Sequence, residues 1–217
     1  MGYIVIDTET SSLFRHRDDA GNVIRSDAPG QPRMAEFAAI LLDHDFKVER
    51  EFQSYIQPVG WDHDMTPEAE AVNGLSMEFL RANGRPVMDA LMFYIGAVRD
   101  EGRIVVGFNQ QHDGRVMRAE LRRAGLDDLF ETTPNICAMR SIHTNLRGQV
   151  KKLNGKGGFP RLIDAAAHFG IPYDESQHHS ALDDARVTAA VVWELHKLGA
   201  LLEPAVHHAK GFSGEVA

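Results

Sequence analysis

Two acidic residues close the first apolar run of the chain, and their spacing favours metal binding. Residues 3–7 read YIVID, a short β-branched run typical of a strand, and Glu9 follows two positions after Asp7. Because side chains two residues apart on a strand share a face, both carboxylates would project together. Acidic residues also follow buried strands simply as loop formers, so this pair alone leaves both interpretations open.

Two further acidic motifs lie far along the chain, each at the expected start of a helix. They are GFNQQHD at 107–113 and HHSALDDA at 178–185. Asp113 could be a helix N-cap, and Asp183 has the S-x-x-D spacing of a capping box. Asp184 has no such structural role, because a helix turns by about 100° per residue and carries it away from Asp183.

The elements that would position these acids begin as strands and continue as strands mixed with helices. Apolar spacing predicts strands at 3–7, 36–42, 51–56 and 103–106, and helices at 76–82, 87–98, 113–124, 160–169 and 180–198. This order indicates an α/β fold with a mixed sheet. No repeat or linker divides the chain, so we expect one domain at 1–199 and a short tail at 200–217.

Composition limits the environment and the partners. Hydrophobic residues make up 43% of the 217, enough for a sizeable core, and the single Cys137 excludes an internal disulfide and a cysteine-rich zinc site. A reducing, cytoplasmic setting is expected, and neither a membrane span nor a signal peptide fits the sequence. A formal charge of −8 excludes a generally basic nucleic-acid coat, although not a local basic groove or carboxylates neutralised by metal ions.

Taken in order, three motifs resemble those of the DEDDh group in the DnaQ-like 3′-5′ exonuclease superfamily. They are Asp7-x-Glu9, N-x-x-H-D from Asn109 to Asp113, and His179-x(4)-Asp184. The segments QPRMAEFAAILLD and MTPEAEAVNGLSMEFL also look like the family, and the resemblance covers residues 3–196. It implies an RNase H-like core, a mixed five-stranded sheet flanked by helices, which agrees with the predicted element order.

The resemblance also implies a chemistry. Two Mg²⁺ or Mn²⁺ ions would be held by Asp7, Glu9, Asp113 and Asp184, since such hard ions prefer oxygen ligands. His179 would be the general base toward the attacking water, with His178 as the second choice. The implied reaction releases nucleoside 5′-monophosphates from DNA or RNA 3′ ends. Sugar type and strandedness stay open.

Substrate contacts are expected from several places. The resemblance puts the backbone of Thr10 near the 3′ hydroxyl and Leu13 against the terminal base, although core packing of Leu13 is an equal alternative. Asn109 belongs to the second motif. The basic, glycine-rich stretch 147–161 could bind phosphates or be an ordinary solvated face; its candidate contacts are Lys151, Lys152 and Lys156.

Residues 14–33 form a polar, turn-rich insertion, longer than the usual connection of the family. DDAGN at 18–22 could close a small hairpin, and we expect the insertion to act as a flap whose deletion changes substrate preference more than stability. On the helix after Asp113, we interpret Arg115, Arg118 and Arg122 as a solvent-facing stripe.

Two other functions compete with the exonuclease. The chain could be a catalytically silent module that binds nucleic-acid ends or a partner, or a phosphohydrolase of small nucleotides. Silent relatives normally lose a motif acid or the histidine, and all five residues are present here. A polymerase or a second copy of the chain is a possible partner, and the tail at 200–217 is a possible docking surface, although a frayed terminus is the simpler interpretation.

Overall fold

The structure is a computed structural model that describes residues 2–129, 132–150, 158–174 and 180–206. Within these ranges a five-stranded sheet has the order β3-β2-β1-β4-β5. Its strands are β1 (Tyr3–Thr10), β2 (Met34–Leu42), β3 (Val48–Tyr55), β4 (Ile104–Gly107) and β5 (Asn135–Cys137). β1 pairs antiparallel with β2 and parallel with β4, so the sheet is mixed, as predicted.

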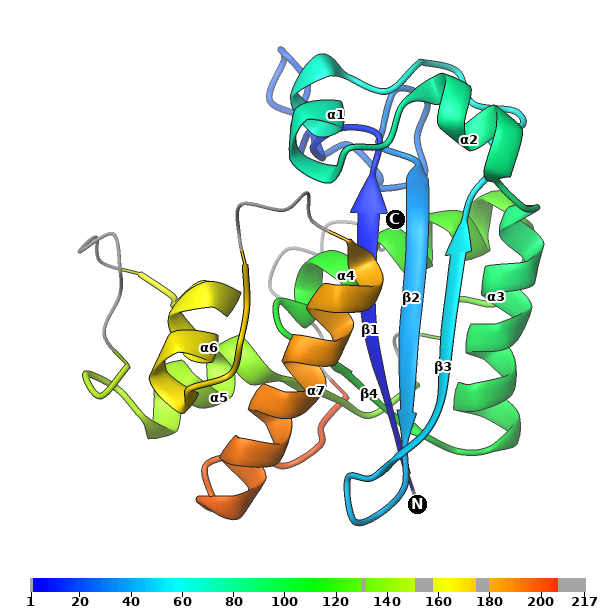
Figure 1. The fold of residues 1–217 in the computed structure, drawn as a ribbon. Helices are drawn as coiled ribbons and strands as arrows, with labels where there is room; N and C mark the ends of the chain where they lie inside the picture. The colour runs from blue at the N-terminus through cyan, green and yellow to red at the C-terminus, as the bar shows by residue number, and fades with distance from the viewer. Residues whose placement is uncertain (1, 130–131, 151–157, 175–179, 207–217) are drawn as a thin grey trace.

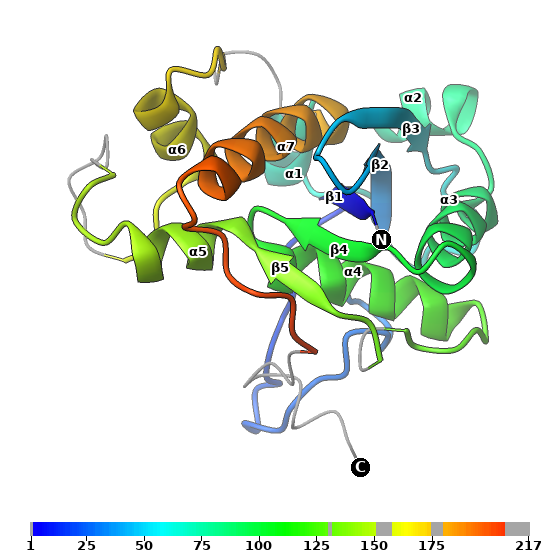
Figure 2. The same ribbon diagram turned by 90° about the horizontal axis from the view of Figure 1, so that it is seen from below.

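Helices cover both faces of the sheet, as Figures 1 and 2 show. One face carries α5 (Ala138–Asn145), α6 (Leu162–Phe169) and α7 (Ala181–Lys197); the other carries α3 (Val87–Ile95), its π-helical extension η1 (Gly96–Asp100) and α4 (Gln110–Arg123). The short helices α1 (Pro67–Asn73) and α2 (Met77–Asn83) lie beyond the end of β1. In the described ranges, no helix is both long and apolar enough to cross a membrane.

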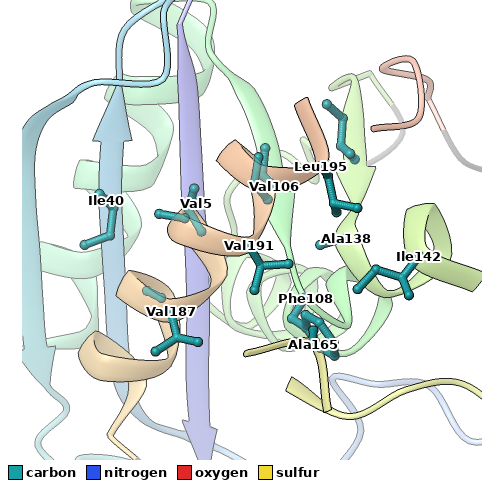
Figure 3. Close-up of a cluster of buried hydrophobic side chains, with 14 of the residues drawn as sticks. Val5, Ile40, Val106, Phe108, Ala138, Ile142, Ala165, Val187, Val191 and Leu195 are labelled. Atoms are coloured by element: carbon teal, nitrogen blue, oxygen red, sulfur yellow. The ribbon is translucent and has the colours of Figure 1, made fainter. Parts of the chain in front are cut away.

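Strand alternation divides the core into two layers. The odd-numbered residues of β1 face α7, where Val5 packs in one hydrophobic cluster, and the even-numbered Ile4 and Ile6 pack in a second cluster on the α3 and α4 side. Figure 3 shows the first cluster, with Val5, Ile40, Val106, Val187, Val191 and Leu195 among its labelled members. Because alternation continues along β1, Asp7 and Glu9 also face α7.

The sequence prediction missed β5 and α5. A three-residue strand is too short to show an alternating pattern. The apolar period of α5 extends over only eight residues directly after it, so the pair was not recognised as a strand and a helix. The predicted helix at 113–124 instead begins at Gln110. The segment 200–206 is not detached from the sheet, because Ala205 bridges to Asn135 of β5.

The solvent-facing arginine stripe was a wrong prediction. Arg115 and Arg118 are buried, and Arg118 pairs with Asp128. The reason is that α4 has no open face: the sheet lies on one side of it and the insertion at 14–33 lies on the other. The spacing of the arginines along α4 does not reveal the distant residues that pack over them, so a buried stripe was interpreted as a solvent-facing one.

The insertion contains the expected small hairpin, with Arg17 bridged to Val23 and the amide of Asp18 donating to the carbonyl of Asn22. The insertion also contacts α4. The Arg123 guanidinium donates hydrogen bonds to the carbonyl oxygens of Ser26 at 3.1 Å and of Pro32 at 3.0 Å. A deletion of 15–31 would therefore remove these contacts and cost some stability, and the expectation that it changes substrate preference more than stability stays a prediction.

Candidate active site

Two carboxylates of β1 and one from the start of α7 meet at the end of β1. One oxygen each from Asp7, Glu9 and Asp184 can be chosen so that all three atoms lie within 4.8 Å of one another. Asp7 and Glu9 point toward α7 from β1, and α7 lies across this face with Asp184 in its first turn. The geometry follows from strand alternation on one element and helix phase on the other.

Asp113 approaches from the opposite side, outside this close group of three. It is buried in the first turn of α4, and its Oδ1 accepts a hydrogen bond from the Thr8 hydroxyl at 2.9 Å. Thr8 is an even-numbered β1 residue and so faces α4. Asn109, not Asp113, occupies the N-cap position of α4, so the capping interpretation of Asp113 was wrong. The capping box at α7 is absent too, because Ser180 makes no side-chain cap and exposed Asp183 pairs with Arg186 at 3.0 Å.

The electrostatics of the cluster call for a positive charge. Burial raises the pKa of Asp7 well above its usual range, and the charges of Asp113 and Glu9 raise it further. Burial, followed by the charges of Glu36 and Asp184, raises the pKa of Glu9 to about 8. A set of buried carboxylate oxygens fits a hard divalent cation such as Mg²⁺ or Mn²⁺, whose charge would favour their ionised forms.

Leu13 and His112 line two cavities near the end of β1. Leu13 is 84% exposed, which excludes the core-packing alternative. A cavity of about 230 Å³ contains Glu9, Thr10 and Leu13 in its lining, and a second of about 450 Å³ contains Leu13 and Asn109. Thr10 lines the cavity that includes Glu9, and Asn109 lines the other; their roles as substrate contacts stay predictions.

Five of the predicted residues lie outside the described ranges. They are His178 and His179, together with the loop lysines Lys151, Lys152 and Lys156. Their proposed roles therefore stay predictions.

The model of the RNase_T exonuclease family matches residues 4–192. The chain belongs to this exonuclease family. Curated relatives of this chain include the PolC-type DNA polymerase III of Thermotoga petrophila, 26% identical over 87% of this chain and 11% of that protein. An uncharacterized exonuclease, CP81, of Escherichia phage 186 is 28% identical over 61% of this chain and 68% of that protein.

Solved structures show the same fold. Exonuclease I from Methylocaldum szegediense has a TM-score of 0.70 at 21% identity, and the match covers 98% of this chain and 42% of that one. Exonuclease I of E. coli in complex with a dA16 oligonucleotide has a TM-score of 0.67 at 21% identity, and the match covers 90% of this chain and 41% of that one. The RNase H-like fold implied by the sequence is confirmed. This chain spans about two fifths of the length of these solved chains and about a tenth of the polymerase.

Three residues that contact the acids or the start of α7 were not singled out from the sequence. Glu36 of β2 lies opposite Glu9 in the strand register, and its two oxygens accept hydrogen bonds from Gln53 Nε2 at 2.6 Å and from the amide of Ala181 at 3.2 Å. Ala181 is the first residue of α7, so Glu36 ties the start of that helix to the sheet. The one signal available was an acid inside a wholly buried strand, MAEFAAILL.

The other two missed residues contact the cluster directly. The Tyr173 hydroxyl donates to Oδ1 of Asp184 at 2.9 Å, and a side-chain hydrogen bond from buried Asn73 lowers the pKa of Glu9 against the effect of burial. Asn73 also donates to the carbonyl of Thr10 at 3.3 Å. Asn73 lies within the family-like segment MTPEAEAVNGLSMEFL but was not singled out there, and Tyr173 belongs to no motif. Long-range contacts such as these carry no local sequence signal.

Proposed function

We propose that this chain is a metal-dependent 3′-5′ exonuclease that hydrolyses the terminal phosphodiester bond and releases nucleoside 5′-monophosphates. The observation that carries the proposal is the meeting of Asp7, Glu9 and Asp184 within 4.8 Å, with Asp113 entering from the other side, in a chain of an exonuclease family. Four converging carboxylates repel one another unless a cation is bound between them. Hydrolysis of a phosphodiester by two metal ions requires such cations.

Asp7, Glu9, Asp113 and Asp184 are the residues that would hold two Mg²⁺ or Mn²⁺ ions. Bound there, the ions would supply Lewis-acid activation of water and would neutralise charge at the scissile phosphate. The chain's own contribution is to fix these oxygens: Thr8 orients Asp113, Tyr173 orients Asp184, and Asn73 hydrogen-bonds Glu9. His179 would take the proton of the attacking water, a role suited to a side chain that titrates near ~6.5.

The smaller cavity is the proposed site of the 3′-terminal nucleotide. It adjoins Glu9, and its lining includes Thr10, Leu13 and Val72, so a base could lie on apolar atoms while the backbone near Thr10 meets the 3′ hydroxyl. Apolar contacts with a base do not depend on its identity, so we expect little sequence preference. Lys151, Lys152 and Lys156 are proposed to contact phosphates further along the strand.

Single-stranded DNA is the substrate to test first. Exonuclease I of E. coli is solved in complex with DNA oligonucleotides, and the PolC-type relative is a DNA polymerase, which also makes a polymerase a reasonable partner to test. The sequence leaves the sugar type open, so RNA is included beside DNA.

Product analysis tests the proposal. The full chain would be incubated with 5′-labelled and 3′-labelled single-stranded and duplex DNA and RNA, with Mg²⁺, Mn²⁺ or EDTA. We expect a stepwise ladder from the 3′ end that requires metal and is abolished in Asp7→Asn and Asp184→Asn, both of which should stay folded. Binding without cleavage would favour the silent module, whereas intact polymers with hydrolysed free nucleotides would favour the phosphohydrolase.

A further inference from the structure

The loop at residues 10–13, here called the β1 end loop, is anchored through Ser11. The amide of Ser11 donates to the carbonyl of Arg33, and its side-chain oxygen accepts from the amide of Arg33, both at 2.9 Å. The carbonyl of Ser11 accepts from the amide of Thr66 at 2.9 Å. Ser11 has no exposed surface, so the loop is held at this residue by segments that lie far from it in the sequence.

A histidine and an aspartate complete the anchor. The side-chain oxygen of Ser11 lies 3.0 Å from Nε2 of His63, and Nδ1 of His63 lies 2.8 Å from Oδ1 of Asp62. The amide of Gly30 donates to the other oxygen of Asp62 at 2.6 Å, and this bond, followed by that of His63, lowers the pKa of Asp62. An ionised carboxylate can only accept, so Nδ1 carries the proton of the neutral ring. Nε2 then accepts from the Ser11 hydroxyl.

Serine, histidine and aspartate linked in this order also form the nucleophilic triad of serine hydrolases. A nucleophile has to be reached by its substrate, and the side chain of Ser11 is completely buried. Its oxygen also accepts from the amide of Arg33, so a rotation toward a substrate would break two hydrogen bonds. The arrangement therefore suits holding a backbone segment in place and does not suit attack on a substrate.

The segment that is held forms part of the proposed site for the 3′-terminal nucleotide. Thr10, Ser12 and Leu13, on either side of Ser11, line the smaller cavity together with Thr66. The Thr10 hydroxyl donates to the carbonyl of Ser12 at 2.9 Å, which links the two neighbours of Ser11 to each other. If the anchor at Ser11 is lost, fewer molecules have the loop in its binding shape, and the apparent affinity falls by that fraction.

We propose that His63 is a positioning residue of this exonuclease. Through its hydrogen bond to Ser11, and with its ring fixed by Asp62, it holds the β1 end loop in the shape that receives the 3′-terminal nucleotide. His63 belongs to none of the three acidic motifs and acts on the substrate only through Ser11. The inference rests on the proposed exonuclease function and adds to it a residue that sets substrate affinity.

Two amide variants separate the two hydrogen bonds of the ring. In His63→Asn the short side chain reaches the position of Nδ1, so it keeps the contact with Asp62 and loses Ser11. In His63→Gln the longer side chain reaches the position of Nε2 and keeps the bond to Ser11. We expect oligonucleotide KM to rise by roughly 5- to 30-fold in His63→Asn, the size of one lost buried hydrogen bond, and by less than about threefold in His63→Gln.

The split between KM and kcat distinguishes positioning from a general loss of structure. The metal-binding acids lie on β1, α4 and α7, so kcat should stay within about threefold of the wild type in both variants. The p-nitrophenyl ester of thymidine 5′-monophosphate contains a single nucleotide. Its KM should rise by the same factor as that of the oligonucleotide, because the β1 end loop meets only the terminal nucleotide.

Hydrogen exchange follows the anchor without any substrate. In the free enzyme, the amides of 10–13 should exchange faster in His63→Asn than in the wild type, and His63→Gln should restore slow exchange. Ser11→Ala removes the same bond from its other end. Combined with His63→Asn, it should raise KM by less than the product of the two single effects, because both changes remove one shared interaction.

His44→Asn is the matched control. His44 is exposed and lies 3.5 Å from the carboxylate of the next residue, Asp45, so it repeats the His63 pairing with an adjacent aspartate. It lies in the turn between β2 and β3, at the end of the sheet opposite α1 (Figure 1). This variant should match the wild type in KM and in hydrogen exchange.

The outcomes separate this inference from the proposed function. If the wild type degrades oligonucleotides and His63→Asn matches it in KM, the positioning role is wrong while the exonuclease stands. Equal losses in His63→Asn and His63→Gln would also overturn the inference, because the bond to Ser11 would then not be the one that matters. A fall in kcat with unchanged KM would overturn it as well. A wild type that degrades no oligonucleotide would overturn both proposals.

Discussion

The hydroxyl of Tyr173 donates a hydrogen bond to Oδ1 of Asp184 at 2.9 Å, from the segment between α6 and α7. Partners that orient a metal-binding carboxylate typically affect metal affinity or activity by 10- to 100-fold. We therefore expect Tyr173→Phe to weaken activation by Mn²⁺ by roughly tenfold, seen as a higher metal concentration for half-maximal activity. The metal-dependent rise in melting temperature should shift to higher concentrations as well.

Tyr3→Phe is the matched control for this prediction. Tyr3 and Tyr173 both pack against the same hydrophobic cluster, and the change removes the same oxygen atom. If Tyr3→Phe and Tyr173→Phe respond alike to metal, the hydrogen bond to Asp184 has no special role and the effect is one of packing.

Glu36 accepts a hydrogen bond from the first residue of α7, so its removal should destabilise the start of that helix. Glu36→Ala leaves the amide of Ala181 and the Gln53 side chain without their acceptor, and an unsatisfied buried donor costs about 1–3 kcal/mol. We expect the free energy of unfolding in urea to fall by at least this amount and metal binding to weaken, because Asp184 lies three residues into the helix that Glu36 anchors.

Glu36→Gln distinguishes anchoring from charge. The amide oxygen of the new side chain can still accept a hydrogen bond from the amide of Ala181. The new NH₂ group can donate to the side-chain oxygen of Gln53 once that side chain rotates, so both hydrogen bonds are kept without the negative charge. We expect Glu36→Gln to keep most of the stability and metal affinity that Glu36→Ala loses. Equal losses in the two variants would show that the charge of Glu36, not its hydrogen bonds, is what the site needs.

The sequence predicts the features of this structure that depend on residues close together in the chain better than those that depend on distant contacts. Asp7 and Glu9 share a strand, so alternation alone places them on one face, and the helix phase of Asp184 correctly turns it away from Asp183. The mixed sheet follows from the order of strands and helices. These are local patterns or simple topology, and a single sequence records them well.

Apart from the short elements β5 and α5, the features that were missed are long-range. Arg115 contacts His16 of the insertion, Arg118 pairs with Asp128, and Glu36 meets Ala181 across 145 positions of chain. No periodicity within α4 or β2 contains that information. The catalytic role of His179 rests on the resemblance, and the phosphate contacts of the loop lysines rest on the basic composition of 147–161. Both sets of residues lie outside the described ranges.

The metal-free protein should lose stability as pH rises. Burial raises the pKa of Glu9 from an ordinary value of about 4.5 to about 8, so the folded state holds a proton in this window that the unfolded state has released. The stabilising contribution of protonated Glu9 is complete below about pH 4.5 and is lost as pH rises through about 8. In EDTA, we expect the melting temperature of the wild type to fall more steeply over this window than that of Glu9→Gln.

Saturating Mn²⁺ provides the internal control for this pH series. A cation that binds the ionised carboxylates stabilises the folded state, so the wild type should regain stability at pH 8 whereas Glu9→Gln should gain less. Parallel pH profiles of the two proteins in EDTA would contradict the raised pKa of Glu9.

The attachment of the insertion to α4 depends on Arg123, and its removal should loosen the insertion without unfolding the enzyme. Arg123 donates to the carbonyls of Ser26 and Pro32 and to the carboxylate of Glu120. Arg123→Met keeps the apolar stem but removes every donor, and we expect the free energy of unfolding to fall by about 1–3 kcal/mol. Limited proteolysis should then cut within 14–33 several times faster than in the wild type, since local opening exposes the backbone.

Arg99→Met is the control, because Arg99 is an exposed arginine that pairs with Asp127 on the surface at 3.6 Å. Surface ion pairs of this kind contribute about 0–1 kcal/mol, so this variant should be cut in the insertion at the rate of the wild type. If Arg123→Met is also cut at that rate, the remaining contacts of the insertion, such as the amide of Gly30 donating to Asp62 at 2.6 Å, are sufficient to hold it. Arg123→Met could instead be cut faster while its KM for oligonucleotides stays unchanged. In that case the part of the insertion that contacts Arg123 packs against α4 for stability and does not contribute to substrate binding.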